Sequence, residues 1–332
     1  MKLGVLDVGS NTAHLLVVDG ADGDLEPVLR AKERLRLAER LGPGGRLDRA
    51  CVDRMARAVE TAVAKAERAG AEELLVYATA VVRDAPNRDE VLTAVRRRTG
   101  VTMEVLPGRR EAELTLLAAR RWMGHRAGPM AVLDVGGGSF EVACGTGESA
   151  RFAASLPMGA GRLTREFFGH DDPPSPQAVR ALRHHVREAM DEVCRHLRTE
   201  APSTAVATSR TFQQLARLCG APPARKGPLV PRRLARRDVK KAAKRLAAAP
   251  AAERATWPGI SAARARQSAA GAIVAHTVMK LAGIDEVHIC PWALREGALL
   301  HHLNTRPAAA APHAAPGLLT PTPVLPPHAR AA

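Results

Sequence analysis

The chain has 332 residues, which is long enough for two domains of ordinary size, each with a hydrophobic core of its own. A formal net charge of +15 favours a polyanionic partner, such as polyphosphate or a highly phosphorylated nucleotide, although it is also typical of a chain that simply prefers arginine. Five widely spaced cysteines without a Cys-x-x-Cys pair argue against a disulfide framework and a zinc site. The first strand begins almost at Met1 and no apolar run reaches membrane-spanning length, so we expect a cytoplasmic protein without a membrane partner.

The chain opens with an apolar strand that carries Asp7 and ends in a small polar turn, residues 9–12 (the first glycine turn). Such a turn points backbone N–H groups outward, where they suit an oxyanion. A returning strand is predicted over residues 13–19, and its His14 is interpreted as a core or interface histidine because no second ligand stands at a suitable spacing. The pattern then predicts a third strand over residues 28–37 and a helix over residues 47–70.

A buried strand at residues 74–78 runs into a polar segment that contains Thr79 and Arg83. Open α/β sheets bind ligands beyond the carboxyl ends of their parallel strands. Arg83 is therefore a candidate for binding an anion through its guanidinium, and the alternative is an exposed arginine that forms a salt bridge. A helix over residues 89–99 and a strand over 101–106 follow. The next helix, residues 108–122, has Glu111 in its first turn, where a carboxylate is favourable in any helix.

Residues 131–144 repeat the start of the chain. Val132-Leu133-Asp134-Val135-Gly136 is identical to the segment 127 residues earlier, and Gly136, Gly137, Gly138 and Ser139 form a turn (the second glycine turn) before a returning strand. The carboxylates of Asp134 and Glu141 are hard oxygen ligands suited to Mg²⁺, and Asp7 is their counterpart in the first repeat. We interpret this hairpin as a phosphate and metal site, with a plain glycine-rich hairpin as the alternative.

The remaining segments alternate strands and helices. We predict strands over residues 150–156, 205–207 and 287–290, and helices over 159–164, 176–198, 261–283 and 292–300. The basic segment, residues 225–245, is interpreted either as a solvent-exposed helix surface or as a surface that binds a polyanion. Residues 305–332 are rich in proline and alanine, and we expect a disordered tail there.

The duplicated strand, aspartate and glycine turn predicts an α/β protein of two similar domains. The arrangement resembles the ribonuclease H-like domains of the actin, sugar-kinase and Hsp70 superfamily, whose two phosphate-facing turns share an interdomain cleft. We place the domains at residues 1–125 and 126–304, followed by the tail at 305–332.

Three further motifs make the resemblance more specific. They are Ala-Thr-Ala-Val-Val-Arg-Asp-Ala at residues 78–85, Gly-x-x-Glu-Ala-x-Leu at 108–114 and Leu-Arg-Glu-Gly at 294–297. Together with both glycine turns, they resemble the exopolyphosphatase and guanosine pentaphosphate phosphatase (Ppx/GppA) family in one collinear order over residues 3–304. The chain is similar to the short, two-domain form of that family.

The resemblance implies specific roles. Glu111 maps onto the catalytic base or water-positioning group, and Asp134 and Glu141, with Asp7 as their counterpart, are the expected ligands of Mg²⁺ or alternatively Mn²⁺. The residues expected to bind phosphate are Gly9, Ser10, Asn11, Thr12, Arg83, Gly136, Gly137, Gly138 and Ser139. The chain departs from the family at Arg110, where an acid is usual and where a cation would lower the pKa of Glu111, and at Phe140, where a threonine is usual.

The resemblance implies an exopolyphosphatase that releases orthophosphate from the end of inorganic polyphosphate by Mg²⁺-assisted attack of water. The alternatives are a guanosine pentaphosphate 5′-phosphohydrolase, a kinase-like phosphotransferase of the same superfamily, and a non-catalytic sensor of polyphosphate or guanosine tetraphosphate. A nucleic-acid partner is not expected, because no helix-turn-helix, zinc or aromatic platform is present. A homodimer is expected from the family resemblance.

Overall fold

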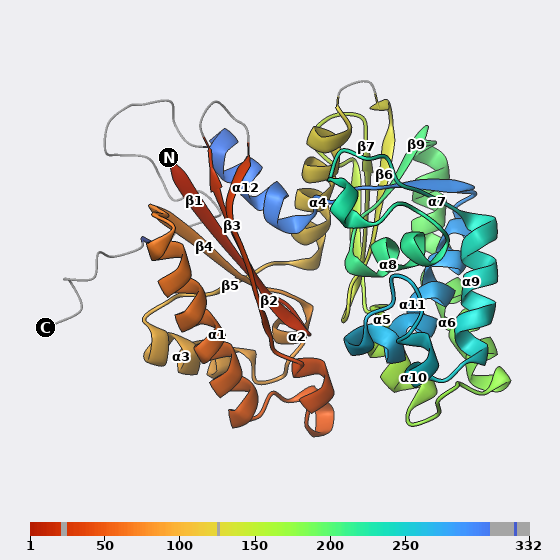
Figure 1. Cartoon of the computed structure of the whole chain (residues 1–332), viewed down its shortest axis with the longest axis horizontal. Helices are drawn as coiled ribbons and strands as arrows, with labels where there is room; N and C mark the ends of the chain where they lie inside the picture. The colour runs from red at the N-terminus through yellow and green to blue at the C-terminus, as the bar shows by residue number, and fades with distance from the viewer. Residues whose placement is uncertain (21–24, 125–126, 306–321, 324–332) are drawn as a thin grey trace, which may run out of the picture. The chain divides into compact units, whose positions relative to one another are not determined.

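The computed structural model describes residues 1–20, 25–124, 127–305 and 322–323, and its chain divides into two compact units (Figure 1). Unit 1 contains residues 1–107 together with 295–332, and unit 2 contains residues 108–294. The boundaries predicted after residues 125 and 304 therefore differ from these by one helix each. The helix that follows Pro107 joins unit 2, and the last helix of the chain returns to unit 1.

Unit 1 is built on one mixed sheet. Its strands are β1 (Lys2–Val8), β2 (Thr12–Asp19), β3 (Glu26–Arg34), β4 (Glu73–Ala78) and β5 (Glu104–Val105). They lie in the order β3-β2-β1-β4, and β5 pairs with β4. The pairs β1–β2 and β2–β3 are antiparallel, whereas β1–β4 and β4–β5 are parallel. The short β12 (Thr322–Pro323) also pairs with β4, in antiparallel fashion.

Helices cover the sheet of unit 1. The helices are α1 (Arg49–Arg68), α2 (Ala80–Arg83), α3 (Arg88–Thr99) and α12 (Leu294–Thr305), with 3-10 turns at Leu37–Arg40 and Pro43–Gly45. Met55 and Val59 of α1 are fully buried against Leu6 and Leu15 of the sheet. Helix α12 belongs to this unit because its buried Glu296 pairs with Arg30 of β3 and its buried His302 lies 2.8 Å from the Glu73 carboxylate of β4.

Unit 2 repeats the same sheet order. Its strands are β6 (Met130–Val135), β7 (Phe140–Gly145), β8 (Phe152–Leu156), β9 (Thr204–Ala207), β10 (Arg233–Ala235) and β11 (Glu286–Ile289). They lie in the order β8-β7-β6-β9-β11-β10, with β6–β7 and β7–β8 antiparallel and β6–β9 and β9–β11 parallel. The first five positions match unit 1 in order and direction, which confirms the predicted duplication and fold class.

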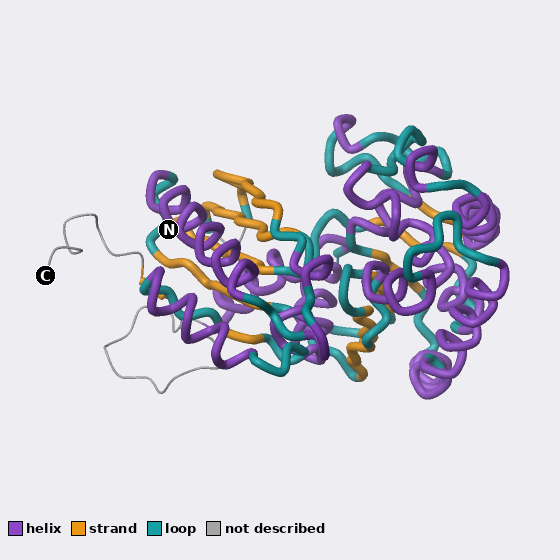
Figure 2. The backbone as a smooth tube through the Cα atoms, turned by 90° about the horizontal axis from the view of Figure 1, so that it is seen from below, coloured by secondary structure: helices purple, strands orange, loops and turns teal. Residues whose placement is uncertain are grey.

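The helices of unit 2 surround this sheet (Figures 1 and 2). They are α4 (Gly108–Met123), α5 (Ala160–Leu163), α6 (Pro176–Ala189), α7 (Asp191–Glu200), α8 (Arg210–Leu218), α9 (Arg236–Ala248), α10 (Ala251–Arg254) and α11 (Ala262–Leu281), with short turns at Thr164–Phe168 and Ala224–Lys226. Helix α4 belongs to unit 2 because Ala112 and Leu116 are buried against Val132 and Ala143 of the sheet. The single helix predicted over residues 176–198 is two helices, α6 and α7, separated by the buried Met190.

The basic segment is only partly helical, which corrects the sequence prediction. Its helix α9 begins at Arg236, and the residues before it include the edge strand β10. Five of its cations contact neighbouring groups of unit 2: Arg232 donates to four backbone carbonyls, Arg233, Arg236 and Arg237 pair with acids, and Arg245 stacks on Trp257. These contacts give a structural role to five of the ten cations in the segment.

The described residues also bear on three other expectations from the sequence. All five cysteines are free thiols, and Cys51, Cys144, Cys194 and Cys290 are buried. None of the helices in the described part of the chain combines the length and the hydrophobicity that a membrane span requires. The predicted disordered tail lies outside the described residues, apart from Thr305 and the two residues of β12.

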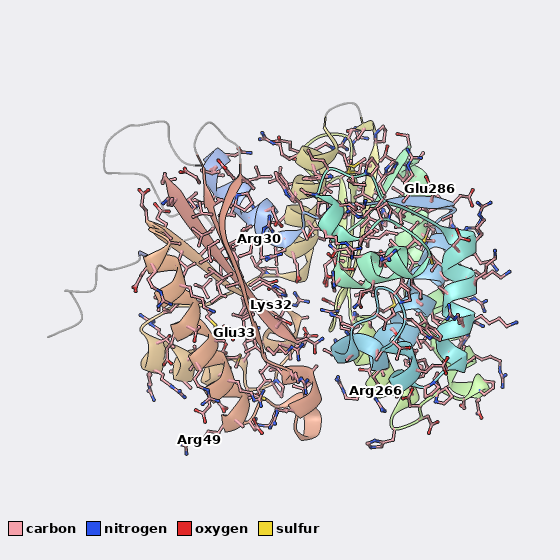
Figure 3. All side chains as sticks on the ribbon, viewed as in Figure 1. Arg30, Lys32, Glu33, Arg49, Arg266 and Glu286 are labelled. Atoms are coloured by element: carbon pink, nitrogen blue, oxygen red, sulfur yellow. The ribbon has the colours of Figure 1, made fainter. Side chains whose placement is uncertain are left out.

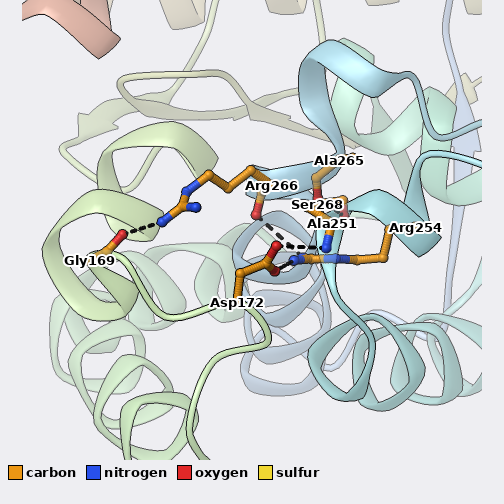
Figure 4. A network of polar contacts seen from close by, with 7 residues as sticks. All are labelled: Gly169, Asp172, Ala251, Arg254, Ala265, Arg266 and Ser268. Atoms are coloured by element: carbon orange, nitrogen blue, oxygen red, sulfur yellow. Dashed lines mark hydrogen bonds and ion pairs between the residues drawn. The ribbon is translucent and has the colours of Figure 1, made fainter.

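A buried ion pair joins three segments of unit 2 (Figure 4). The guanidinium of Arg254, which is 1% exposed, pairs with the carboxylate of Asp172. The other oxygen of Asp172 accepts a hydrogen bond from the Ala251 backbone N–H at 2.8 Å, and Arg266 of α11 donates to the Gly169 carbonyl. The network therefore ties the loop at residues 169–172 to α10 and α11.

We expect Asp172→Asn to lower the free energy of unfolding by about 3 kcal/mol, because it leaves the charge of Arg254 buried without its partner. Urea denaturation followed by circular dichroism measures this change. The neighbouring Asp171→Asn is the matched control, since Asp171 is exposed and its replacement should leave the midpoint unchanged. Equal midpoints for the two variants would show that the pair contributes nothing to stability.

Candidate active site

A row of polar side chains crosses the sheet of unit 2 next to the second glycine turn. Asp134 of β6 lies opposite Glu141 of β7, and Glu141 lies opposite Ser155 of β8. Residues paired across neighbouring strands in this way project from the same face of a sheet. The Ser155 hydroxyl donates a hydrogen bond of 2.8 Å to Glu141 Oε1, which fixes the orientation of the buried carboxylate.

Thr208 extends the row on the other side of Asp134. It follows β9 directly, and its backbone N–H donates to the carbonyl of Leu133 at 3.0 Å. Its hydroxyl donates to Asp134 Oδ2, and the backbone N–H of Ser209 also donates to Asp134. Ser209 has φ 51° and ψ 158°, a strained conformation for any residue other than glycine. The strained residue thus contributes a hydrogen bond to the candidate site.

The second glycine turn is held in place by the start of α5. The Gly136 carbonyl accepts from the N–H of Ala160, and the Gly137 carbonyl accepts from the N–H groups of Gly161 and Arg162, at 2.9–3.0 Å. With both carbonyls directed to α5, the N–H groups of Gly137 and Gly138 have no hydrogen-bond partner among the described residues. Unpaired backbone donors beside carboxylates are suited to an anionic ligand.

Burial raises the pKa values of Asp134 and Glu141, and neighbouring carboxylates add to the shift at Glu141. The pKa of Glu141 lies well above its usual value because of burial, then because of the charges of Glu111 and Asp134, while hydrogen bonds from Ser139 and Ser155 oppose the shift. Burial also raises the pKa of Asp134, against the effects of Thr208 and of the Arg264 charge. We call Glu111, Asp134 and Glu141 the acid cluster. Bringing three carboxylates together in this way is costly without a bound cation.

Helix α4 supplies Glu111, one turn after its first residue, and its packing on β7 and β8 brings that side chain to the row. Two arginines precede Glu111 in the same turn. Arg109 and Arg110 donate to the two oxygens of Glu113 at 3.0 and 3.2 Å. Arg110, which was expected to act on Glu111, therefore pairs with Glu113.

Two carboxylates of the acid cluster, Asp134 and Glu141, fit a magnesium ion. Within the described ranges, no three side chains of His, Cys, Asp or Glu are placed to hold a metal ion by themselves. Mg²⁺ is usually bound by only one or two carboxylates, with water and substrate phosphates completing its coordination. Asp134 and Glu141 match that requirement, and a divalent cation would relieve the repulsion that raises the pKa of Glu141.

The first hairpin of unit 1 repeats the strand pairing of this site with different side chains. Asp7 lies opposite His14 in the β1–β2 pair, as Asp134 lies opposite Glu141, so the first repeat has a histidine where the second has an acid. The first glycine turn closes with a hydrogen bond of 3.1 Å from the Gly9 N–H to the Thr12 carbonyl, which matches the bond from Gly136 to Ser139. The residues predicted to bind metal are thus a pair in unit 2 and a single carboxylate in unit 1.

Arg83 of unit 1 is only 17% exposed. Its guanidinium donates to the Leu106 carbonyl at 3.2 Å and lies 3.5 Å from the Asp84 carboxylate. Arg83 and residues 7–12 therefore belong to unit 1, whereas Glu111 and residues 134–141 belong to unit 2. That both sets face one cleft stays a prediction.

Two residues of this site, Ser155 and Arg264, were not singled out by the sequence, whereas Thr208 lies in the small polar turn after the predicted strand at residues 205–207. Ser155 reaches Glu141 through strand pairing, which leaves no local signal. Arg264 acts on Asp134 from the first turn of α11. A cation is disfavoured by the helix dipole at that position, and this unfavourable placement is the signal that could have identified it.

Comparison with known proteins gives consistent results. The model of the Ppx/GppA phosphatase family matches residues 16–306. Exopolyphosphatase 1 of Mycobacterium tuberculosis is 45% identical over 307 residues, which cover 92% of this chain and 89% of that protein. The guanosine-5′-triphosphate,3′-diphosphate pyrophosphatase of Aeromonas hydrophila is 30% identical over 63% of this chain and 42% of that protein. The crystal structure of an exopolyphosphatase from Cytophaga hutchinsonii has the same fold, with a TM-score of 0.82, 23% identity and coverage of 92% of this chain and 98% of that one.

Proposed function

Because the chain belongs to the Ppx/GppA phosphatase family, we propose that it is an exopolyphosphatase, which hydrolyses the terminal phosphoanhydride of inorganic polyphosphate and releases orthophosphate. The observation that carries this proposal is the acid cluster beside the second glycine turn, whose N–H groups at Gly137 and Gly138 have no described partner. Phosphoryl transfer to water requires hydrogen-bond donors that stabilise the phosphate oxygens and a carboxylate that positions the water. The high identity to exopolyphosphatase 1 over nearly the whole chain supports the choice of substrate.

Glu111 orients the attacking water and takes its proton as the water oxygen bonds to the terminal phosphorus. The bridging P–O bond breaks, and its electron pair leaves with the shortened polyphosphate. The N–H groups of Gly137 and Gly138 and the Arg264 guanidinium hold the terminal phosphate and stabilise charge on its oxygens.

Asp134 and Glu141 would hold Mg²⁺, with Mn²⁺ as the alternative, and a bound ion would neutralise charge on the phosphate oxygens. Thr208 and Ser155 keep these two carboxylates in a fixed orientation by donating hydrogen bonds to them.

Guanosine pentaphosphate is the alternative substrate. The relative from Aeromonas, which its name describes as a pyrophosphatase of this nucleotide, aligns over less than half of its own length, whereas exopolyphosphatase 1 aligns over nearly all of its length. This difference in coverage favours inorganic polyphosphate.

The test is orthophosphate release by the purified protein with long-chain polyphosphate, tripolyphosphate and guanosine pentaphosphate. Each substrate is assayed with Mg²⁺, with Mn²⁺ and with excess EDTA. We expect the highest kcat/KM on polyphosphate and no release in EDTA. Faster release from the nucleotide would establish the alternative substrate, and polyphosphate binding without release from any substrate would identify a sensor.

A further inference from the structure

Helix α11 has a buried hydrogen-bond donor that is not used within the described part of the chain. The amide nitrogen Nε2 of Gln267 is buried, and it has no hydrogen-bond partner among the described residues. Its neighbour in the chain, Arg266, lies at the surface and donates to the Gly169 carbonyl (Figures 3 and 4). The helix therefore turns Arg266 outward and the amide of Gln267 inward. An unpaired buried amide costs free energy, which a bound ligand can recover.

The amide of Gln267 lies beside the second glycine turn. A Cβ atom at Gly161 would lie 2.8 Å from Gln267 Oε1 and 3.1 Å from the Gly137 carbonyl oxygen, so both oxygens approach the same point of α5. Gly161 also donates its N–H to that carbonyl at 2.9 Å. Gln267 and Gly137 both belong to unit 2. The amide is thus next to the backbone whose N–H groups we assign to the terminal phosphate.

The amide also lines a small cavity between α5, α8 and α11, together with Arg264. The other polar side chains of the lining, Thr211, Gln214 and Ser268, donate hydrogen bonds to neighbouring protein groups. Gln267 and Arg264 are three residues apart and therefore lie on the same face of the helix. Since the charge of Arg264 acts on Asp134, this face of α11 borders the candidate active site.

Close packing of α11 fixes the position of Gln267. Gly271 lies one turn further along the same face, and a Cβ atom there would lie 2.7 Å from Thr211 Cγ2 and 3.2 Å from Ala160 Cβ. Helix α11 therefore fits against α5 and α8 without room for a larger side chain. A donor held in place by such packing needs little reordering when a ligand binds.

We infer that Gln267 is a further substrate-binding residue, whose amide N–H donates to an oxygen of the phosphate held at the second glycine turn. The inference rests on the proposed function and adds a residue to the same site. A neutral amide stabilises the negative charge on the phosphate oxygens by hydrogen bonding. Because the contact is made at the reacting phosphate, it acts on long and short substrates alike.

The test compares the wild type with Gln267→Met, which keeps the length of the side chain but has no donor. We expect kcat/KM to fall about tenfold on both long-chain polyphosphate and tripolyphosphate. Gln177→Met is the matched control, because Gln177 is an exposed glutamine near the start of α6 in the same unit. The control should change kcat/KM less than about twofold. A lower midpoint of thermal unfolding for Gln267→Met with an unchanged kcat/KM would give Gln267 a structural role only and overturn the proposal.

Gln267→Glu separates phosphate binding from a structural role, and it decides the case in which Gln267→Met loses both stability and activity. A carboxylate at this position repels the phosphate, whereas the protonated acid is a donor again. We therefore expect kcat/KM relative to the wild type to be low at about pH 8 and to recover as the pH falls to about 5. A ratio that does not change with pH would overturn the proposal.

If the wild type releases no orthophosphate, the proposed function fails, and Gln267 is judged by equilibrium binding of tripolyphosphate. Binding about tenfold weaker for Gln267→Met than for Gln177→Met supports the contact with phosphate in that case. Equal binding by the two variants overturns it.

Discussion

Replacing Glu111 with glutamine is expected to lower kcat for orthophosphate release from polyphosphate by about a hundredfold or more. Glutamine keeps the size of the side chain but cannot accept the proton of the attacking water. The replacement also removes one of the charges that raise the pKa of Glu141, so the folded protein should lose no stability. A phosphate-release assay together with thermal unfolding measures both effects.

Glu113→Gln is the control for this variant. Glu113 lies in the same turn of α4 and binds Arg109 and Arg110, outside the acid cluster. Its replacement should leave kcat within about twofold of the wild-type value. If Glu111→Gln folded normally and kept a rate similar to that of Glu113→Gln, Glu111 would not be the catalytic base.

Gly159→Ala is expected to lower kcat/KM at least about tenfold and to destabilise unit 2 by about 2 kcal/mol. A Cβ atom at this position would lie 2.4 Å from backbone atoms of Gly138 and Ser139. Backbone cannot rotate away as a flexible side chain can, so the second glycine turn must move. The N–H groups that we assign to the terminal phosphate would move with it.

The control for this substitution is Gly147→Ala. A Cβ atom at Gly147 meets nothing within 4 Å, and Gly147 has no positive φ, so the same chemical change has no steric cost there. Urea denaturation and steady-state kinetics compare the two variants. If the two variants had equal activity and equal stability, the close approach of α5 to the second glycine turn would matter neither for activity nor for stability.

The duplication of the domains was predictable from the sequence because its signals are local. An apolar strand, an aspartate and a glycine turn occur twice, and the same strand order follows each copy in the structure. Most strands and helices were predicted for the same reason, since hydrophobic periodicity acts over a few residues. The split between α6 and α7, the partly helical basic segment and the short helices α2 and α10 were not predicted.

Domain boundaries depended on packing rather than on composition. The sequence suggested a boundary between residues 125 and 126, but the buried face of α4 packs on the sheet that follows it in the chain. Helix α12 likewise returns to the first sheet, where Glu296 and His302 find their partners. A helical pattern shows that a helix has a buried face, but not which sheet will cover it.

The sequence by itself determined which residue types the site contains: a glycine turn, Asp134 and Glu141 beside it, and Glu111 at the start of a helix. Only the tertiary structure decided which of them act on one another. Strand register placed Ser155 beside Glu141, a parallel crossover brought Thr208 to Asp134, and helix packing brought the charge of Glu111 to Glu141. The physical reason is that secondary structure follows from neighbours in the chain, whereas a shared face depends on register and packing between segments far apart in sequence.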